Sequence, residues 1–261
     1  MDNNVTNPVT FFRKKVHHSG FINTFTLKII AIICMTIDHI GACLGTTYYN
    51  GNYYLSGLMS MNTYTLLRII GRIAFPIFCY LIVEGLFYTK DVFAYVLRLL
   101  IFALFSQIPF SLLTRGEALS FSKNLNVFFT LAIGLITISG MEYCKTCCKK
   151  NIVNKPMCVF LDMVAVVCAV SFADTINCDY AGYGIVVIVI FYVLKDRPFL
   201  ITLGLLLATL AMSEMMELFA LIAMIPILLH NHQKGPSMKY VFYSYYPVHM
   251  LIIYFISTLL K

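Results

Sequence analysis

The chain has 261 residues, of which 60% are hydrophobic and only 12% are charged. Soluble domains average about 45–50% apolar and about 25% charged residues, so this composition excludes an ordinary soluble fold. It also excludes an intrinsically disordered chain, because such chains are poor in apolar residues. The sequence therefore predicts a polytopic membrane protein, in which every charged side chain within a span is costly and informative.

Nine apolar segments are candidates for transmembrane helices, which need about 20 residues each. They cover residues 27–45, 64–88, 92–113, 127–143, 157–173, 183–194, 199–212, 215–230 and 240–260. We therefore expect an all-α fold, a polytopic transmembrane helix bundle of about nine spans. Residues 1–26 are expected to form a polar N-terminal segment in the cytoplasm, and 27–261 the transmembrane domain.

The net charge of +7 does not indicate binding of nucleic acid, because most lysines and arginines lie in the short segments between the spans, where they set the membrane topology. With the N-terminus in the cytoplasm, 13 of the 19 lysines and arginines lie in inner segments and 3 in outer segments. The remaining three, Arg68, Arg72 and Arg98, lie within spans. Because cytoplasmic loops are enriched in Lys and Arg, this bias predicts a multi-pass protein of a bacterial cytoplasmic membrane with its N-terminus inside.

The first span carries Asp38 and His39 well inside the membrane. A charged group at the centre of a bilayer costs about 2.5–3.5 kcal/mol, so these residues indicate either a functional site or a buried ion pair. Lys28 and His39 share one helix face to within about 20° and are about 16 Å apart along the axis. This face suits a long ligand with an anionic head at the cytoplasmic edge and a reactive tail deep in the membrane.

The second span supplies the expected partner of Asp38. Arg72 lies about 12 Å from the outer edge and His39 about 18 Å from the inner edge, depths that coincide in a hydrocarbon core about 30 Å thick. We therefore expect Asp38, His39 and Arg72 to lie in one layer. Gly71 permits close helix approach there, and Pro76 should kink the span one turn later.

Four further polar residues lie in or beside the spans. Glu84 is level with Lys28 and either pairs with it or faces a pocket. Arg98 either snorkels to the cytoplasmic interface or offers a fork for phosphate. Gln107 lies near the outer side of the third span, and Asn126 opens the fourth, where helix capping is its ordinary role.

The last span contains Tyr246 and His249, which are neighbours on one helix face because they are three positions apart. His249 lies near the middle of the membrane and is either simply hydrogen-bonded or part of a site. A cytoplasmic run holds Cys144, Cys147 and Cys148 among lysines. Contact with anionic lipids is its ordinary explanation, with acylation as an alternative. No metal site is expected, since no His or second Cys pair stands near this run in the sequence.

Several segments carry a common set of motifs, namely residues 27–41, 67–78, 84–85, 95–99, 106–110, 125–131 and 245–250. The most specific are Asp-His-Ile-Gly in the first span and Gly-Arg-x-x-x-Pro in the second. Together they resemble the TraX family, the conjugal pilin acetylation proteins. The Lys28-x10-His39 spacing is also similar to the Arg/Lys-x10-His motif of the broader membrane acyltransferases. The agreement is weak between residues 141 and 177.

The resemblance implies a CoA-dependent N- or O-acetyltransferase whose transmembrane domain is acyltransferase-like. Cytoplasmic acetyl-CoA donates its acetyl group to an amine or hydroxyl, such as a pilin-like N-terminus or an envelope glycan. On this hypothesis Lys28 and Arg98, helped by Lys90, hold the CoA phosphates. His39 is the general base, and Arg72, tied to Asp38, holds the layer or stabilises the thioester oxyanion. The expected substrate pocket is completed by Gln107, Asn126, Tyr246, His249 and Glu84. The implied partners are acetyl-CoA, membrane lipids and the acceptor.

Two other classes of function stay open at this point. A proton-coupled transporter or flippase would use Asp38, His39, Glu84 and His249 as a relay. A non-catalytic membrane scaffold for a conjugation or envelope complex is the third class. Stabilisation by CoA in detergent is expected only of the enzyme, whereas pH-dependent flux without CoA is expected of the transporter.

Overall fold

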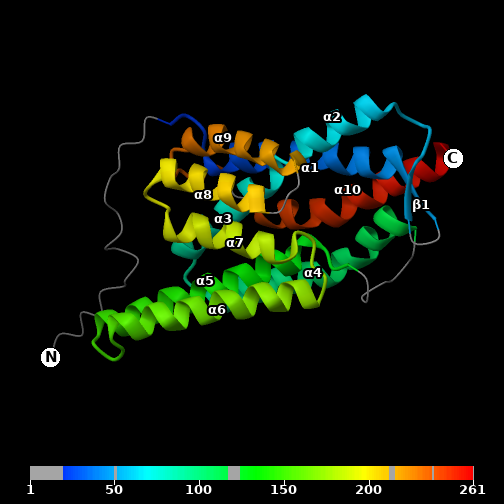
Figure 1. Ribbon diagram of the computed structural model, residues 1–261. Helices are drawn as coiled ribbons and strands as arrows, with labels where there is room; N and C mark the ends of the chain where they lie inside the picture. Colours follow the sequence, from blue (N-terminus) through cyan, green and yellow to red (C-terminus); the bar gives the residue numbers. More distant parts are fainter. Residues whose placement is uncertain (1–19, 50–51, 117–123, 212–214, 237, 261) are drawn as a thin grey trace.

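The computed structural model describes residues 20–49, 52–116, 124–211, 215–236 and 238–260 of the chain. Nearly all of this part is helical, which confirms the predicted all-α bundle (Figure 1). The helices in chain order are α1 (Thr24–Gly45), α2 (Met61–Gly71), α3 (Ala74–Tyr88), α4 (Val92–Arg115), α5 (Val127–Lys149), α6 (Lys155–Thr175), α7 (Ala181–Val193), α8 (Pro198–Ala211), the 3₁₀ helix η2 (Met215–Ala223), α9 (Met224–Leu228) and α10 (Lys239–Leu260). A small antiparallel hairpin, β1 (Thr46–Tyr49) and β2 (Asn52–Leu55), follows α1.

Five helical segments in the described part of the chain are long and apolar enough to cross a membrane. They are Thr24–Gly45, Met61–Tyr88, Val92–Arg115, Val127–Lys149 and Lys155–Thr175. The shorter apolar helices α7 and α8 have 13 and 14 residues. At 1.5 Å per residue each is only about 20 Å long, less than the hydrocarbon core of a bilayer. The count of nine spans and the cytoplasmic N-terminus therefore stay predictions.

The second predicted span is divided into α2 and α3 at residues 72 and 73. Pro76 has no N–H to donate to the carbonyl of Arg72, and its ring clashes with that carbonyl in a regular helix. The chain therefore breaks four residues before the proline, one turn earlier than the position that the sequence predicts. This break places Arg72 at the junction of two helices, where its side chain can reach toward η2.

Polar side chains at the loop ends start most of the long helices. Asn23, Ser60, Asp91, Asn126 and Asn154 each accept a hydrogen bond from a backbone N–H of the first turn. Such N-caps satisfy donors that have no partner within the helix. The helix starts are therefore encoded locally, which explains why the predicted boundaries lie close to the observed ones.

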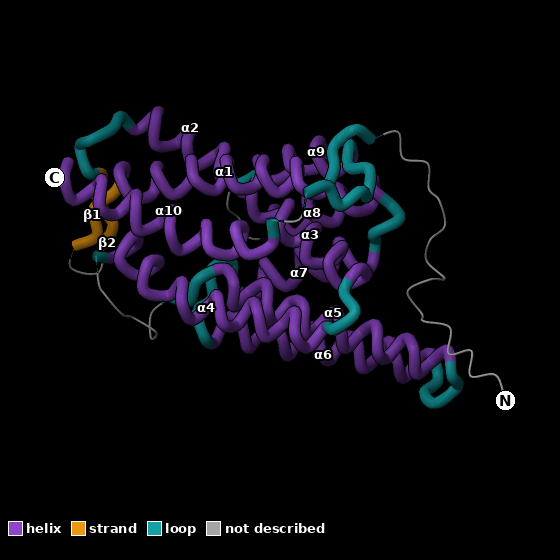
Figure 2. The backbone as a smooth tube through the Cα atoms, turned by 180° about the vertical axis from the view of Figure 1, so that it is seen from behind, coloured by secondary structure: helices purple, strands orange, loops and turns teal. Residues whose placement is uncertain are grey.

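The helices pack in layers around an apolar core. Helix α1 contacts α2, α3 and α10, whereas α4 lies between α10 and α5. Helix α6 covers α5 and α7 along one side of the molecule, opposite α1, α2 and α9 (Figures 1 and 2). Most side chains of α6 point outward, among them Val159, Met163 and Val167, which are 57%, 56% and 64% exposed. An apolar outer surface of this kind is typical of a helix that faces lipid.

Small residues allow α1 and α2 to approach closely. Gly41 and Gly45 form a Gly-x-x-x-Gly pair, and a Cβ on either would meet Leu67 or Tyr64 of α2. A Cβ on Gly71 would overlap the side chain of Asp38. Close approach through small residues is a common basis of helix association in membranes. The expected role of Gly71 is thus confirmed, and the contact brings Asp38 beside the arginines of α2.

Candidate functional site

Two histidines from opposite ends of the chain form a direct hydrogen bond inside the bundle. His39 Nδ1 on α1 lies 2.8 Å from His249 Nε2 on α10. The two ring planes are 6° apart. His249 Nδ1 in turn lies 2.7 Å from the backbone carbonyl oxygen of Tyr245. The structure thus brings together two predicted site residues that are 210 positions apart.

The hydrogen-bond pattern assigns the tautomers of this pair. A carbonyl oxygen only accepts, so His249 Nδ1 carries the proton that is donated to Tyr245. Nε2 of a neutral His249 is then an acceptor, and His39 Nδ1–H donates to it. The unprotonated nitrogen of the pair is therefore His39 Nε2. A general base needs such an arrangement: His39 Nε2 is free to accept a proton, while His39 Nδ1 is held in place by its bond to His249.

Asp38 belongs to a buried ionic layer next to the histidine pair. Its Oδ2 is 2.6 Å from Arg68 Nη1, and its Oδ1 is 3.9 Å from Arg72 Nη2. Arg72 Nη1 lies 2.6 Å from Glu217 Oε1 of η2. The predicted layer of Asp38, His39 and Arg72 is present, but the closest partners differ from those expected. Arg68 is the main partner of Asp38, and Glu217 is the main partner of Arg72.

The connection before α7 is folded against this layer. The ring of Tyr180 is stacked on Phe75 of α3, with centroids 3.6 Å apart. The backbone N–H of Asp179 donates to the carbonyl oxygen of Leu125 at 2.7 Å. The connection before α7 therefore packs against α3 as part of the bundle.

A cavity of about 400 Å³ opens between α1, α3, α4 and α10. Its size falls within the range of about 300–1,000 Å³ that is usual for small-molecule sites. The charged residues that line it are Lys28, Glu84, Arg98 and Lys234. Aromatic rings form much of its wall, namely Phe78, Tyr88, Tyr95, Phe128, Phe242, Tyr243 and Tyr246. The cavity thus combines three cations with an aromatic and apolar body.

Two of the three predicted phosphate-binding cations lie at this cavity. Lys28 Nζ is 5.2 Å from the centroid of Phe242, and the Arg98 guanidinium carbon is 5.7 Å from that of Tyr95. Nε of Arg98 is buried and makes no hydrogen bond to any described residue. Lys90 is exposed on the α3–α4 connection and is not part of the described lining.

Tyr246 connects the cavity to the histidine pair. Its ring lines the cavity, and its centroid is 6.0 Å from that of His39 and 5.8 Å from that of His249. Along α1, Lys28, Ile32 and Met35 line the cavity, and His39 follows one turn later on the same face. The predicted face of α1 therefore leads from the cations to the imidazole, as the spacing indicates.

Gln107 and Asn126 do not line this cavity. Asn126 Nδ2 donates to Ala103 O at 2.7 Å and to Gln107 Oε1 at 3.0 Å, while Gln107 Nε2 donates to Asn124 O at 2.8 Å. Both side chains are fully buried between α4 and the start of α5. Their hydrogen bonds join these helices, and Asn126 also caps α5, which is its ordinary role.

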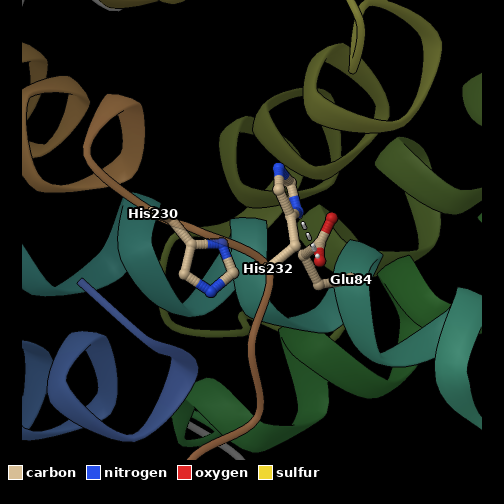
Figure 3. Close-up of side chains that lie close together, drawn as sticks. All are labelled: Glu84, His230 and His232. Atoms are coloured by element: carbon tan, nitrogen blue, oxygen red, sulfur yellow. Dashed lines mark hydrogen bonds and ion pairs between the residues drawn. The ribbon is translucent and has the colours of Figure 1, made fainter. Parts of the chain in front are cut away.

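A second histidine cluster lies at the end of α3. Glu84 Oε2 is 3.2 Å from His232 Nδ1, and His230 lies beside this pair (Figure 3). The hydrogen bond to Glu84 raises the pKa of His232 above its ordinary value, and this effect outweighs the opposing effect of burial. Glu84 is thus paired with His232 rather than with Lys28, the ion pair that the sequence left open.

Several residues of these clusters are not identified as site residues from the sequence. Arg68 is a charge within the second predicted span and Glu217 a charge within the eighth, but the sequence indicates no partner for either of them. His230 is the last residue of the eighth predicted span, and His232 and Lys234 follow it, where they resemble ordinary loop residues. Only the packing of distant helices shows that they meet the predicted residues.

The cysteine run at the end of α5 lies close to a cysteine of α6. Cys144 Sγ on α5 lies 3.4 Å from Cys158 Sγ on α6. The sequence run that holds Cys144, Cys147 and Cys148 therefore meets a further cysteine at the α5–α6 turn. This contact packs the two helix ends together and is separate from the cavity.

The fold and the site define the class of the molecule. It is a multi-helix membrane protein with a cation-lined cavity that leads toward a hydrogen-bonded histidine pair within the bundle. The TraX protein family matches residues 24–257, nearly the whole described chain, and the protein belongs to this family.

A curated relative supports the same relationship. The chain is 26% identical over 259 residues to "Probable fimbrial assembly protein FimC, serogroup H1" of Dichelobacter nodosus. The alignment covers 88% of this chain and 94% of that protein. No solved structure matches the chain significantly.

Proposed function

We propose that the protein is an integral membrane acyltransferase of the bacterial cytoplasmic membrane, which moves an acetyl group from cytoplasmic acetyl-CoA to an amine or hydroxyl. The observation that carries this proposal is the cavity itself. It has Lys28, Arg98 and Lys234 in its lining, and Tyr246 joins it to the His39–His249 pair. A ligand with a phosphate-bearing head and a reactive thioester tail matches both features.

The donor head is assigned to the cations of the cavity. Phosphate groups favour lysine and arginine partners, and arginine offers a planar fork for two phosphate oxygens. The buried Arg98 Nε has no acceptor among the described residues, so an anionic ligand supplies one. Lys90 is one residue beyond Thr89, which lines the cavity, and is assigned a peripheral role.

His39 is assigned as the general base. Its Nε2 removes a proton from the acceptor amine or hydroxyl while the acceptor nitrogen or oxygen attacks the thioester carbonyl carbon. The new C–N or C–O bond forms, the C–S bond breaks, and the proton on His39 passes to the leaving thiolate of CoA. His249 is assigned as a positioning residue because its Nε2 holds His39 Nδ1 at 2.8 Å.

Asp38 and Arg72 are assigned to positioning as well. Both Nη atoms of Arg72 face carboxylates, those of Glu217 and Asp38. A guanidinium held in this way is poorly placed to stabilise an oxyanion, so the alternative that the sequence left open is less favoured. The ionic layer instead fixes α1 against α2 and thereby sets the position of His39.

The acceptor is assigned as the N-terminal amine of a pilin-type subunit. This choice rests on the family and on the relative named as a fimbrial assembly protein. An envelope glycan hydroxyl is the other acceptor that the chemistry permits. An untargeted search for acetylated products in cells with and without the protein distinguishes the two.

His39→Gln tests the proposal directly. Loss of a general base typically costs about 10²–10⁴-fold in rate, so transfer from labelled acetyl-CoA by the purified protein is expected to fall by this factor. Cys168→Ser, which changes an exposed thiol of α6 away from the cavity, is the matched control and is expected to retain full transfer. Undiminished transfer by His39→Gln contradicts the assignment of the base.

The transporter alternative is less favoured by the contacts. In the described part of the chain Asp38 is paired with arginines, Glu84 with His232 and His39 with His249. The groups of the supposed relay thus fall into separate pairs. A rise in the unfolding temperature of the detergent-solubilised protein on addition of CoA supports the enzyme. Proton-linked flux in liposomes without CoA supports the transporter.

A further inference from the structure

Glu84, His230 and His232 bring three metal-ligating groups together at the end of α3. One imidazole nitrogen of each histidine and one carboxylate oxygen lie within 4.8 Å of one another (Figure 3). Glu84 comes from α3, and the histidines come from the segment after α9. Two imidazoles and one carboxylate are a donor set typical of zinc and other divalent transition metals. We propose that this cluster binds such a cation, with Zn²⁺ as the best fit.

The distances are close to those of a bound ion. A tetrahedral zinc ion with bonds of about 2.0–2.2 Å holds its ligand atoms about 3.4 Å apart. Glu84 Oε2 and His232 Nδ1 are already 3.2 Å apart. Because no pair among the three ligand atoms exceeds 4.8 Å, the remaining nitrogen has to approach by no more than about 1.4 Å to meet the zinc geometry.

The backbone holds the two histidines in place. Asn231 N donates to Ile22 O at 2.8 Å, and Thr24 N donates to Gln233 O at 2.8 Å. His232 between them has a φ of 57°. This left-handed conformation is uncommon for a residue other than glycine, and such strain is concentrated at functional sites. It presents the His232 ring to Glu84 (Figure 3).

Both ring nitrogens of His230 are hydrogen-bonded within the protein. Its Nε2 is 3.0 Å from Thr24 Oγ1, and its Nδ1 is 2.8 Å from the Tyr80 hydroxyl. In a metal-ligating histidine, one ring nitrogen binds the metal and the other forms a hydrogen bond to a protein group, which fixes the ring orientation and the tautomer. Binding of the cation requires one of these two hydrogen bonds to open, and the bond that stays orients the His230 ring.

The test uses the full-length, tag-free protein, stripped with EDTA and titrated with ZnCl₂ in the absence of CoA. One zinc per chain is expected to remain bound through gel filtration, as measured by elemental analysis. Co²⁺ is expected to give ligand-field absorption without the charge-transfer band of a thiolate. Glu84→Gln and His232→Asn are each expected to weaken zinc binding at least tenfold. Asparagine is chosen because it tolerates the left-handed backbone at position 232.

Two controls exclude other zinc donors. The double variant Cys144→Ser/Cys158→Ser removes the two thiols that contact each other between α5 and α6. The double variant His17→Ala/His18→Ala removes two histidines near the N-terminus. Both double variants are expected to bind zinc as the wild type does. Absence of stoichiometric binding by the wild type, unchanged affinity in both ligand variants, or loss of binding in either control overturns the proposal. Acetyl transfer is not measured, so the outcome is independent of the proposed function.

Discussion

His39 and His249 illustrate how individual residues acquire a role through their partners. His249 donates to a backbone carbonyl and thereby becomes an acceptor for His39, which leaves His39 Nε2 unprotonated. An isolated intramembrane histidine has no fixed tautomer. The hydrogen bond between the two histidines therefore fixes the tautomer of His39. The role of His249 thus depends on its ability to accept a hydrogen bond rather than on the size of its side chain.

Variants of His249 test this role. His249→Gln retains an oxygen that can accept from His39 Nδ1–H, whereas His249→Leu cannot accept. We expect the leucine variant to lose about tenfold in kcat or more, since misoriented bases lose part of a contribution of about 10²–10⁴-fold. The glutamine variant is expected to recover most of this loss, and KM for acetyl-CoA is expected to change little in either. Equal kcat values for the two variants contradict a positioning role.

Asp38 and Arg68 form an ion pair that is expected to be costly to break from one side. Their side chains are 15% and 21% exposed, so each is largely removed from water. Removing one partner leaves a charge without compensation and is expected to cost about 3–5 kcal/mol in the free energy of unfolding. Replacing both with apolar residues costs much less, because no charge is left behind.

A double-mutant cycle measures this coupling. Arg68→Met and Asp38→Leu alone are each expected to lower the unfolding temperature strongly, and Asp38→Leu/Arg68→Met is expected to restore most of it. The chain contains no Trp, but the buried thiols of Cys34, Cys43 and Cys79 become reactive on unfolding, so a thiol-reactive fluorophore reports the transition. Additive effects of the two substitutions show that the pair is not coupled.

The contact between helices α1 and α2 depends on glycines, which have no side chain to keep the two backbones apart. Gly71 lies against Asp38 so closely that a Cβ has no space. Gly71→Ala is expected to destabilise the protein by about 1–3 kcal/mol, the usual cost of overpacking, and to reduce transfer because His39 moves with α1. The unfolding temperature and the rate of acetyl transfer are the measurements.

Gly140 on α5 provides the matched control for this substitution. A Cβ there meets nothing within 4 Å. Because alanine is favoured over glycine in a helix by about 0.5–1 kcal/mol, Gly140→Ala is expected to leave stability unchanged or slightly raised. If both variants lose stability to a similar extent, the effect comes from the replacement of glycine itself and not from the contact with Asp38.

The break between α2 and α3 is the element-scale feature that the sequence located only approximately. Pro76 marks the region, but the interruption falls at residues 72 and 73, because the proline removes the hydrogen bond to the residue four positions before it. Arg72 is thereby released from a regular helix. Its bond to Glu217 joins the break to the 3₁₀ helix η2, which the sequence did not predict as such.

For the whole molecule, the orientation in the membrane is a prediction with a direct test. Ile152 in the α5–α6 turn is expected in the cytoplasm, and Leu58 after β2 is expected outside. Both side chains are exposed, at 68% and 45%. In a cysteine-free background, Leu58→Cys is expected to react with a membrane-impermeant maleimide in intact cells, and Ile152→Cys only after permeabilisation. The reverse pattern contradicts the cytoplasmic N-terminus.

The membrane class, the approximate helix positions and the face of α1 that carries Lys28 and His39 could all be predicted from the amino-acid sequence. These depend on composition, on apolar periodicity and on local caps, all of which are properties of short segments. Which polar groups meet could be seen only in the folded structure. Arg68 rather than Arg72 is nearest to Asp38, Gln107 and Asn126 lie outside the cavity, and His230 and His232 join Glu84. Pairings between distant helices depend on their rotation and depth, and a shift of one residue turns a side chain by about 100°.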